Sequence, residues 1–247
     1  MTPILQIGPL ALQTYQVALL LATAAALTLA SRHAAWAGLD GDHLYSAGLY
    51  GLLAGIVAGR LGHVVAYWSA YQQQPLEIIG LNTGAFLLWP GVAGGLAFAA
   101  WYVERHRLPW PRVLDAAAAG LLAALVVTSI GAYFAGRAYG SVSDLPWAVD
   151  LWGIRRHPVQ LYEAATLALG LALILAYRRA IDRGGRTAEI ALLVYGLTRW
   201  LWEPFRADSP LILFGLRAPQ VIGLACILFA AQRLLRPAQM QTEGTAE

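Results

Sequence analysis

The chain has 247 residues, of which 58% are apolar and 13% are charged, with a formal net charge of +3 at pH 7. Soluble domains carry about one-quarter charged residues, so this composition predicts an integral membrane protein. The sequence has no basic tract with interleaved aromatic residues, which argues against nucleic-acid binding. The single cysteine, Cys226, lies in an apolar run, so no intrachain disulfide can form.

Several apolar runs reach the length of about 20 residues that crosses a bilayer. In chain order they cover residues 13–30, 46–69, 84–103, 113–135, 159–177, 187–205 and 217–232. These runs predict an all-α integral membrane protein with seven transmembrane helices in one polytopic domain, residues 1–247. The first thirty residues contain no Lys or Arg, so we expect the first helix to be retained rather than cleaved as a signal peptide.

The distribution of arginine predicts the orientation, because cytoplasmic connectors carry an excess of basic residues. One set of connectors and the C-terminal tail hold Arg32, Arg105, Arg107, Arg112, Arg178, Arg179, Arg183, Arg186, Arg233 and Arg236, whereas the other set holds Arg137, Arg155, Arg156, Arg206 and Arg217. The richer set should face the cytoplasm. We therefore expect the N-terminus outside and the C-terminus in the cytoplasm.

Polar residues gather where the fifth helix is predicted to begin, in RRHPVQLYEA at 155–164. Pro158 suits a first helical turn, because its missing N–H would be unpaired there. His157, Gln160 and Glu163 are then spaced three apart and form a short polar stripe on one face. This stripe either belongs to a functional site or caps the helix.

Arg155 and Arg156 come directly before this helix, where the positive end of the helix dipole opposes them. A bound anion would remove the conflict, because a helix N-terminus beside arginines is suited to phosphate. The alternative is that both arginines extend to lipid headgroups. We favour a phosphate site.

A second polar group lies in LTRWLWEPFRAD, where Arg199, Glu203 and Arg206 fall at i, i+4 and i+7. They share a helix face if the helix continues through Pro204, although proline can kink a helix and open a cavity. A structural ion pair between Arg199 and Glu203 is one reading. The excess positive charge favours an anion ligand instead.

A third group lies in AGRLGHVVAY, where Arg60, His63 and Tyr67 share one helix face. Gly59 and Gly62 would let another helix approach closely, with Arg60 bonded to backbone carbonyls. The other reading is that Arg60 binds a headgroup. If the three arginine-bearing helices converge on one cavity, that cavity would suit a phospholipid headgroup.

Several stretches resemble the prolipoprotein diacylglyceryl transferase family, in the family's order and over nearly the whole chain. The most specific, HPVQLYE at 157–163, matches the family's seven-residue His-Pro-x-Gln-Leu-Tyr-Glu signature. The others are IGPLALQTY at 7–15, ending at the matching Tyr15, GRLGHVVAY at 59–67, YGLTRWLWEPFRADS at 195–209 and PQVIG at 219–223. The resemblance implies the same seven helices with the N-terminus outside.

The resemblance also implies transfer of a diacylglyceryl group from phosphatidylglycerol to the lipobox cysteine of a prolipoprotein. This reaction takes place in the bacterial inner membrane among membrane lipids and requires no metal or soluble cofactor. The residues expected to carry the reaction are His157, as the base, with Arg199 and Glu203. Those expected to bind the substrates are Tyr15, Arg60, Arg137, Arg156, Gln160, Tyr162, Glu163 and Arg206.

The chain departs from the family pattern at two motifs. Ala93 stands where the family has the histidine of its His-Gly-Gly motif. In the fourth predicted helix, Ser129 replaces an arginine, Ala132 and Ala135 replace two asparagines, and Arg137 replaces a glutamate.

Arg137 lies eight residues beyond Ser129, about 12 Å along a straight helix, so it cannot take over the lost arginine's place. The alternative function is therefore a non-catalytic or re-purposed relative that binds an anionic phospholipid or a lipoprotein. A small transporter is disfavoured, because the sequence lacks the paired broken helices of a central substrate site.

Overall fold

The computed structural model describes residues 3–8, 10–80, 84–178, 186–213 and 215–235. Within this part of the chain the long helices are α1 (Thr14–Trp36), α2 (Gly41–Ala66), α4 (Leu88–Arg105), α5 (Trp110–Phe134), α6 (Val159–Ala176), α8 (Thr187–Trp202) and α9 (Ala218–Leu235). Short helical segments are α3 (Trp68–Tyr71), η1 (Pro75–Ile79) and η2 (Glu203–Phe205). Of the arginines assigned to the cytoplasmic side, Arg179, Arg183 and Arg236 lie outside the described residues.

Antiparallel hairpins supplement the helices. They pair β1 (Ile4–Ile7) with β2 (Leu10–Gln13), β3 (Val149–Leu151) with β4 (Ile154–Arg156), and β5 (Leu211–Leu213) with β6 (Leu216–Arg217). The hydropathy pattern did not predict these strands, because each has only two to four residues. The fold is otherwise helical.

Five helices in the described part of the chain are long and apolar enough to cross a membrane: α1, α2, α5, α6 and α9. This is the architecture of a helical integral membrane protein. The other two long helices are less apolar or shorter, since α4 ends in Glu104 and Arg105 and α8 has 16 residues. The runs predicted at 84–103 and 187–205 are therefore present as long helices but are not among these five.

Two helix ends show why the boundaries moved. Helix α2 begins at Gly41, before the predicted residue 46, because the side chain of Asp40 accepts a hydrogen bond from the N–H of Asp42 and caps the helix. Helix α8 ends at Trp202, just before Pro204, which cannot donate a helical hydrogen bond.

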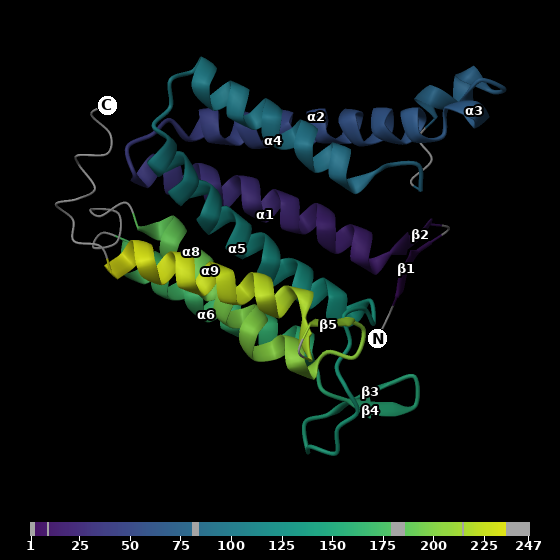
Figure 1. Ribbon diagram of the computed structural model, residues 1–247, viewed down its shortest axis with the longest axis vertical. Helices are drawn as coiled ribbons and strands as arrows, with labels where there is room; N and C mark the ends of the chain where they lie inside the picture. The colour runs from purple at the N-terminus through teal and green to yellow at the C-terminus, as the bar shows by residue number, and fades with distance from the viewer. Residues whose placement is uncertain (1–2, 9, 81–83, 179–185, 214, 236–247) are drawn as a thin grey trace.

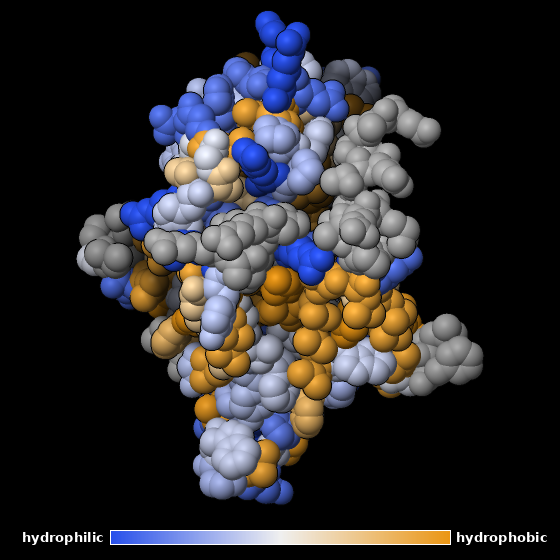
Figure 2. Space-filling model, turned by 90° about the vertical axis from the view of Figure 1, so that its left-hand side faces the viewer, coloured by the Kyte–Doolittle hydropathy of each residue, from blue (hydrophilic) through white to orange (hydrophobic). Residues whose placement is uncertain are grey.

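The helices form three layers (Figure 1). Helices α2 and α4 pack together at one edge, α1 and α5 form the middle layer, and α6, α8 and α9 form the other edge. Figure 2 views the end of the bundle at which α1 joins α2 and α4 joins α5. Hydrophilic side chains cover the upper part of this end. Many large apolar side chains along the helices are exposed, among them Leu20, Val65 and Leu169, as expected where lipid surrounds the bundle.

Glycine lets α2 and α4 approach backbone to backbone. A Cβ atom added to Gly55 would lie 2.9 Å from the carbonyl oxygen of Gly91, and one added to Gly95 would lie 2.9 Å from that of Gly51. Such close approach is the usual way in which helices associate in lipid. There, an apolar side chain gains little by exchanging lipid contacts for protein contacts. The α2/α4 pair therefore depends on small residues.

We expect Gly55→Val to separate α2 from α4 and to destabilise the protein by ~1–3 kcal/mol, the usual cost of overpacking. The readout is the unfolding temperature in detergent micelles, which should fall by several degrees. Gly84→Val is the matched control, because nothing lies within 4 Å of a Cβ atom at Gly84. Equal unfolding temperatures for the two variants would contradict the assigned packing.

Candidate active site

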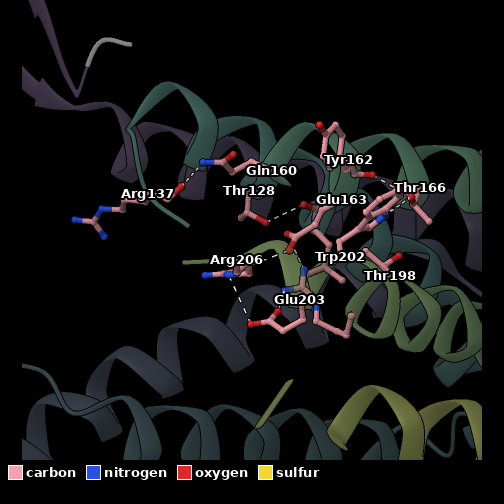
Figure 3. Close-up of polar contacts among 12 residues, drawn as sticks. Thr128, Arg137, Gln160, Tyr162, Glu163, Thr166, Thr198, Trp202, Glu203 and Arg206 are labelled. Carbon is pink, nitrogen blue, oxygen red and sulfur yellow. Dashed lines mark hydrogen bonds and ion pairs between the residues drawn. The ribbon is translucent and has the colours of Figure 1, made fainter. Parts of the chain in front are cut away.

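A cluster of two arginines and two glutamates joins α6 to α8 at one end of the bundle (Figure 3). The Nη2 atom of Arg199 lies 2.8 Å from Oε2 of Glu163 on α6, and its Nη1 atom lies 3.5 Å from Oε2 of Glu203. Arg206 completes the ring, with Nη1 3.7 Å from Oε1 of Glu163 and Nε 3.6 Å from Oε1 of Glu203. We call these four residues the Arg–Glu cluster.

The Arg–Glu cluster is buried. The side chain of Glu203 is 1% exposed and that of Glu163 is 6% exposed. One oxygen of each glutamate, and Nε of Arg199, lie buried without a hydrogen-bond partner within the described part of the chain. Since three of the four contacts are longer than normal hydrogen bonds, the cluster balances charge while leaving hydrogen-bonding capacity unused.

Asp208 is a partner of the cluster that the sequence reasoning missed. Its carboxylate accepts hydrogen bonds from Nε and Nη2 of Arg206 at 2.9–3.0 Å. Burial lowers the pKa of the Arg206 guanidinium, but three neighbouring carboxylates, that of Asp208 first, raise it by more, and the arginine stays charged. The only signal in the sequence was an aspartate two residues after this arginine.

The turn after α8 brings Glu203 and Arg206 to the cluster. The sequence offered either a continuous helix face or a kink at Pro204, and the structure has neither. Helix α8 ends at Trp202, and the 3₁₀ turn η2 follows. Trp202 ties this end of α8 to α6, because its Nε1 donates to the hydroxyl of Thr166 at 2.8 Å.

The first turn of α6 is held by polar contacts to its neighbours. The side chain of Gln160 is buried, and its Nε2 donates to the carbonyl of Arg137, just beyond α5, at 2.6 Å. The hydroxyl of Tyr162 accepts a hydrogen bond of 2.8 Å from Nε1 of Trp147. The helix begins at Val159 without a side-chain cap, so the polar stripe connects elements and does not cap the helix.

Arg155 and Arg156 do not need an anion to balance the dipole of α6. Arg155 donates to the carbonyl of Leu145 at 2.9 Å, and Arg156 donates to that of Gly140 at 3.2 Å. Carbonyl oxygens of the preceding loop thus take the place expected for a phosphate. The guanidinium of Arg156 also lies 4.9 Å from the centre of the Tyr139 ring.

The remaining predicted residues lie outside the Arg–Glu cluster. The Arg137 guanidinium points away from the cluster and lies over the ring of Tyr15, 4.7 Å from its centre (Figure 3). The ring of His157 packs against that of Phe205, with the centroids 5.2 Å apart. His157 therefore lies against η2, the turn that carries Glu203.

The expected convergence of three arginine-bearing helices does not occur. Arg60 lies on α2, in the layer at the opposite edge of the bundle from α6 (Figure 1). Its guanidinium donates to the carbonyls of Ile78 at 3.1 Å and Ala85 at 3.0 Å, and also to that of Glu77. Backbone carbonyls thus hold Arg60, as in the first of the two readings of its sequence. Arg60 cannot approach the Arg–Glu cluster, because α1 and α5 lie between the two outer layers.

Two of the positions that depart from the family pattern are filled by close helix packing. Ser129 and Ala132 are buried in α5, and the intervening Gly131 leaves room only for Ala18 of α1. Ala93 lies exposed on α4, in another layer. Helix α1 therefore closes onto α5 where the family pattern has polar side chains.

The fold and the cluster define a helical membrane protein with buried, paired charges at one end. Within the described residues, no group of three or more His, Cys, Asp or Glu side chains is placed to hold a metal ion. The family model described as prolipoprotein diacylglyceryl transferase matches residues 3–236. The chain belongs to this family.

Curated relatives agree with this assignment. A protein of Pseudoalteromonas translucida is 31% identical, over 98% of this chain and 95% of its own length. Proteins of Photobacterium profundum and Synechococcus elongatus are 30% and 27% identical, each over 94% of this chain and over 91% and 86% of their own lengths. All three are named phosphatidylglycerol–prolipoprotein diacylglyceryl transferase.

We expect Arg199→Met to destabilise the protein by ~3–5 kcal/mol, because it leaves two buried carboxylates with only Arg206. The readout is the unfolding temperature in detergent micelles. Arg233→Met is the matched control, since Arg233 pairs with Glu189 at 3.1 Å but its side chain is 42% exposed, and such pairs contribute ~0–1 kcal/mol. A loss for Arg199→Met no greater than the control's would show that the Arg–Glu cluster does not stabilise the fold.

Proposed function

We propose that this chain transfers a diacylglyceryl group from phosphatidylglycerol to the lipobox cysteine of a prolipoprotein. Membership of the transferase family and the names of the relatives support this activity. The structural observation that carries the proposal is the Arg–Glu cluster, which holds two guanidinium groups together at one end of the bundle. Guanidinium groups match phosphate in charge and geometry.

In the proposed reaction, the cysteine thiolate attacks the carbon of the diacylglyceryl group that is bonded to the phosphate oxygen. A carbon–sulfur bond forms, the carbon–oxygen bond to phosphate breaks, and glycerol phosphate leaves with the bonding electron pair. Arg199 and Arg206 stabilise the negative charge that develops on the leaving phosphate. No metal or soluble cofactor takes part.

The remaining site residues take supporting roles in this proposal. His157 accepts the proton of the thiol, because it packs against η2 while Glu163 and Glu203 are already engaged by arginine. The two glutamates hold the arginines in place. Tyr15, Arg137, Arg156, Gln160 and Tyr162 bind the lipid or shape its site.

A second candidate function is binding of an anionic phospholipid or a lipoprotein without catalysis. The observation in its favour is that the arginines of the cluster are already neutralised by carboxylates, including Asp208. A phosphate must compete with these carboxylates. The close packing of α1 on α5 around Ser129 and Ala132 also leaves little room where the family pattern has larger polar side chains.

The proposed topology is one polytopic domain with seven spans in the bacterial inner membrane, in which α4 and α8 span with the five longer helices. The N-terminus lies outside and the C-terminus in the cytoplasm. The arginine distribution supports this orientation. The lipid and the precursor would then meet at the outer end, where α6 begins.

His157→Gln should reduce transfer by about 10²–10⁴-fold, the usual contribution of a general base, while lipid binding and unfolding temperature stay unchanged. The assay mixes purified protein, radiolabelled phosphatidylglycerol and a lipobox peptide, and counts label on the peptide thiol. His106→Gln is the control, since His106 directly follows α4 and contacts His43 and Tyr102, in the layer at the opposite edge of the bundle. An active relative run in parallel validates the assay.

The assay also separates the two candidate functions. Label on the thiol that is lost in His157→Gln and retained in His106→Gln supports the transferase. If the wild-type protein binds phosphatidylglycerol but transfers no label while the relative does, the non-catalytic function stands in its place.

The topology predicts which single cysteines an impermeant reagent can reach. In a Cys226→Ser background, Asp144→Cys should react with a membrane-impermeant maleimide in intact spheroplasts, because residue 144 lies in the outer connector between α5 and α6. Arg107→Cys, between α4 and α5, should react only after the membrane is permeabilised. Both native residues are exposed. The reverse pattern of labelling would show that the protein has the opposite orientation in the membrane.

A further inference from the structure

The connector between α5 and α6 exposes large apolar side chains although it lies beyond the helices. The side chains concerned are those of Val142, Leu145, Trp147, Trp152 and Ile154. We call residues 142–154, which include the β3–β4 turn, the Trp hairpin. Exposed apolar groups gathered in this way mark a surface that contacts another apolar phase or molecule.

The backbone at the tip of the Trp hairpin is strained around one of these side chains. Leu151 pairs with Ile154, so Trp152 and Gly153 form a two-residue turn, and both have positive φ angles of 55° and 77°. Such turns favour Asn or Gly at their first position, and a bulky residue there is an outlier. Trp152 is nevertheless 69% exposed, and its ring meets that of Tyr139 only edge-on, with the centroids 5.4 Å apart, so most of its surface is left for contacts outside the protein.

The Trp hairpin continues the surface that the helices expose to lipid. Figure 1 places β3 and β4 beyond the end of α6, projecting outward from the layers of helices. Trp147 bonds to Tyr162 in the first turn of α6, where Leu161 is also exposed. The exposed apolar side chains of α6 are expected to face lipid. Because the apolar surface of the hairpin continues that of α6, lipid is the apolar phase expected to contact the hairpin.

The composition of the Trp hairpin fits the boundary between headgroups and acyl chains. Tryptophan and tyrosine concentrate there because each joins an apolar ring to a hydrogen-bonding group. The exposed Arg155 stands beside the hairpin; one of its N–H groups donates to the carbonyl of Leu145, and the others are available to lipid headgroups. The carboxylate of Asp150 is exposed and accepts from the N–H of Gly153 at 3.0 Å, within the turn.

We propose that the Trp hairpin is an interfacial anchor, which inserts Trp152 and Ile154 into the headgroup–acyl boundary of the leaflet beside the Arg–Glu cluster. Its link to the cluster runs through Trp147 and Tyr162 to Trp202, whose ring centroid lies 5.1 Å from that of Tyr162. The anchor fixes the height of the cluster relative to lipid phosphates. The proposal requires only that the protein spans a membrane and does not depend on catalysis.

The test places a polarity-sensitive fluorophore on Ile154→Cys in a Cys226→Ser background, with the full chain reconstituted in lipid nanodiscs. We expect blue-shifted emission that is quenched by spin-labelled lipids and protected from aqueous iodide. The same label on Asp144→Cys, an exposed position in the same hairpin, should be quenched by iodide instead.

A second substitution tests the role of Trp152. In the Ile154→Cys reporter, Trp152→Asn should suit the turn and preserve the fold but lift the label out of the lipid, so that lipid quenching falls and iodide quenching rises. Trp68→Asn is the matched control, because Trp68 is an exposed tryptophan on α3.

Three outcomes overturn the proposal. Iodide quenching at Ile154 equal to that at Asp144 would place the Trp hairpin in water. A blue shift that appears only when a lipobox peptide is added would assign the surface to the acceptor, and one that appears only with two proteins per nanodisc would assign it to a second copy of the chain.

Discussion

The contact between Arg199 and Glu163 governs the end of the bundle where the site lies. Both side chains are buried, and a buried charge without a partner costs several kcal/mol. Since one charge is on α8 and the other on α6, these helices must keep their relative height. The bond from Trp202 to Thr166 acts in the same place. The ion pair thus sets the packing at this end and the position of both charges. A change to Arg199 or Glu163 is therefore expected to affect stability together with any activity.

The two edges of the bundle are held by different forces. Helices α2 and α4 approach through glycine and share one polar contact between His43 and Tyr102, whereas α6 and α8 are joined by ion pairs and side-chain hydrogen bonds. The glycine interface tolerates no larger side chain but needs no exact charge balance. The polar interface depends on charge balance as well as on close packing, since a Cβ atom added to Gly170 of α6 would clash with Val194 of α8. The buried charge pairs therefore lie in the layer whose geometry is specified by hydrogen bonds and ion pairs.

Hydropathy predicted where the long helices lie, because a run of apolar residues in a membrane has few alternatives to a helix. It did not predict their ends, which depend on single residues such as Asp40 and Pro204. Spacing along one helix correctly brought Arg199 near Glu203. The shorter contact, to Glu163, joins two helices and has no trace in local spacing. The same holds for Arg60, whose carbonyl partners lie in a loop, and for the hairpins, whose strands are too short to show a period.

The glycine contact between α2 and α4 has a mechanical consequence. At these glycines the two backbones touch without side chains between them, so sliding of one helix along the other is opposed. Helix α2 meets the rest of the protein chiefly at α1, and Val103 of α4 belongs to the same buried cluster as Val113 and Ala116 of α5. We therefore expect bending or thickness changes of the bilayer at that edge to move α2 and α4 together, two layers away from the Arg–Glu cluster.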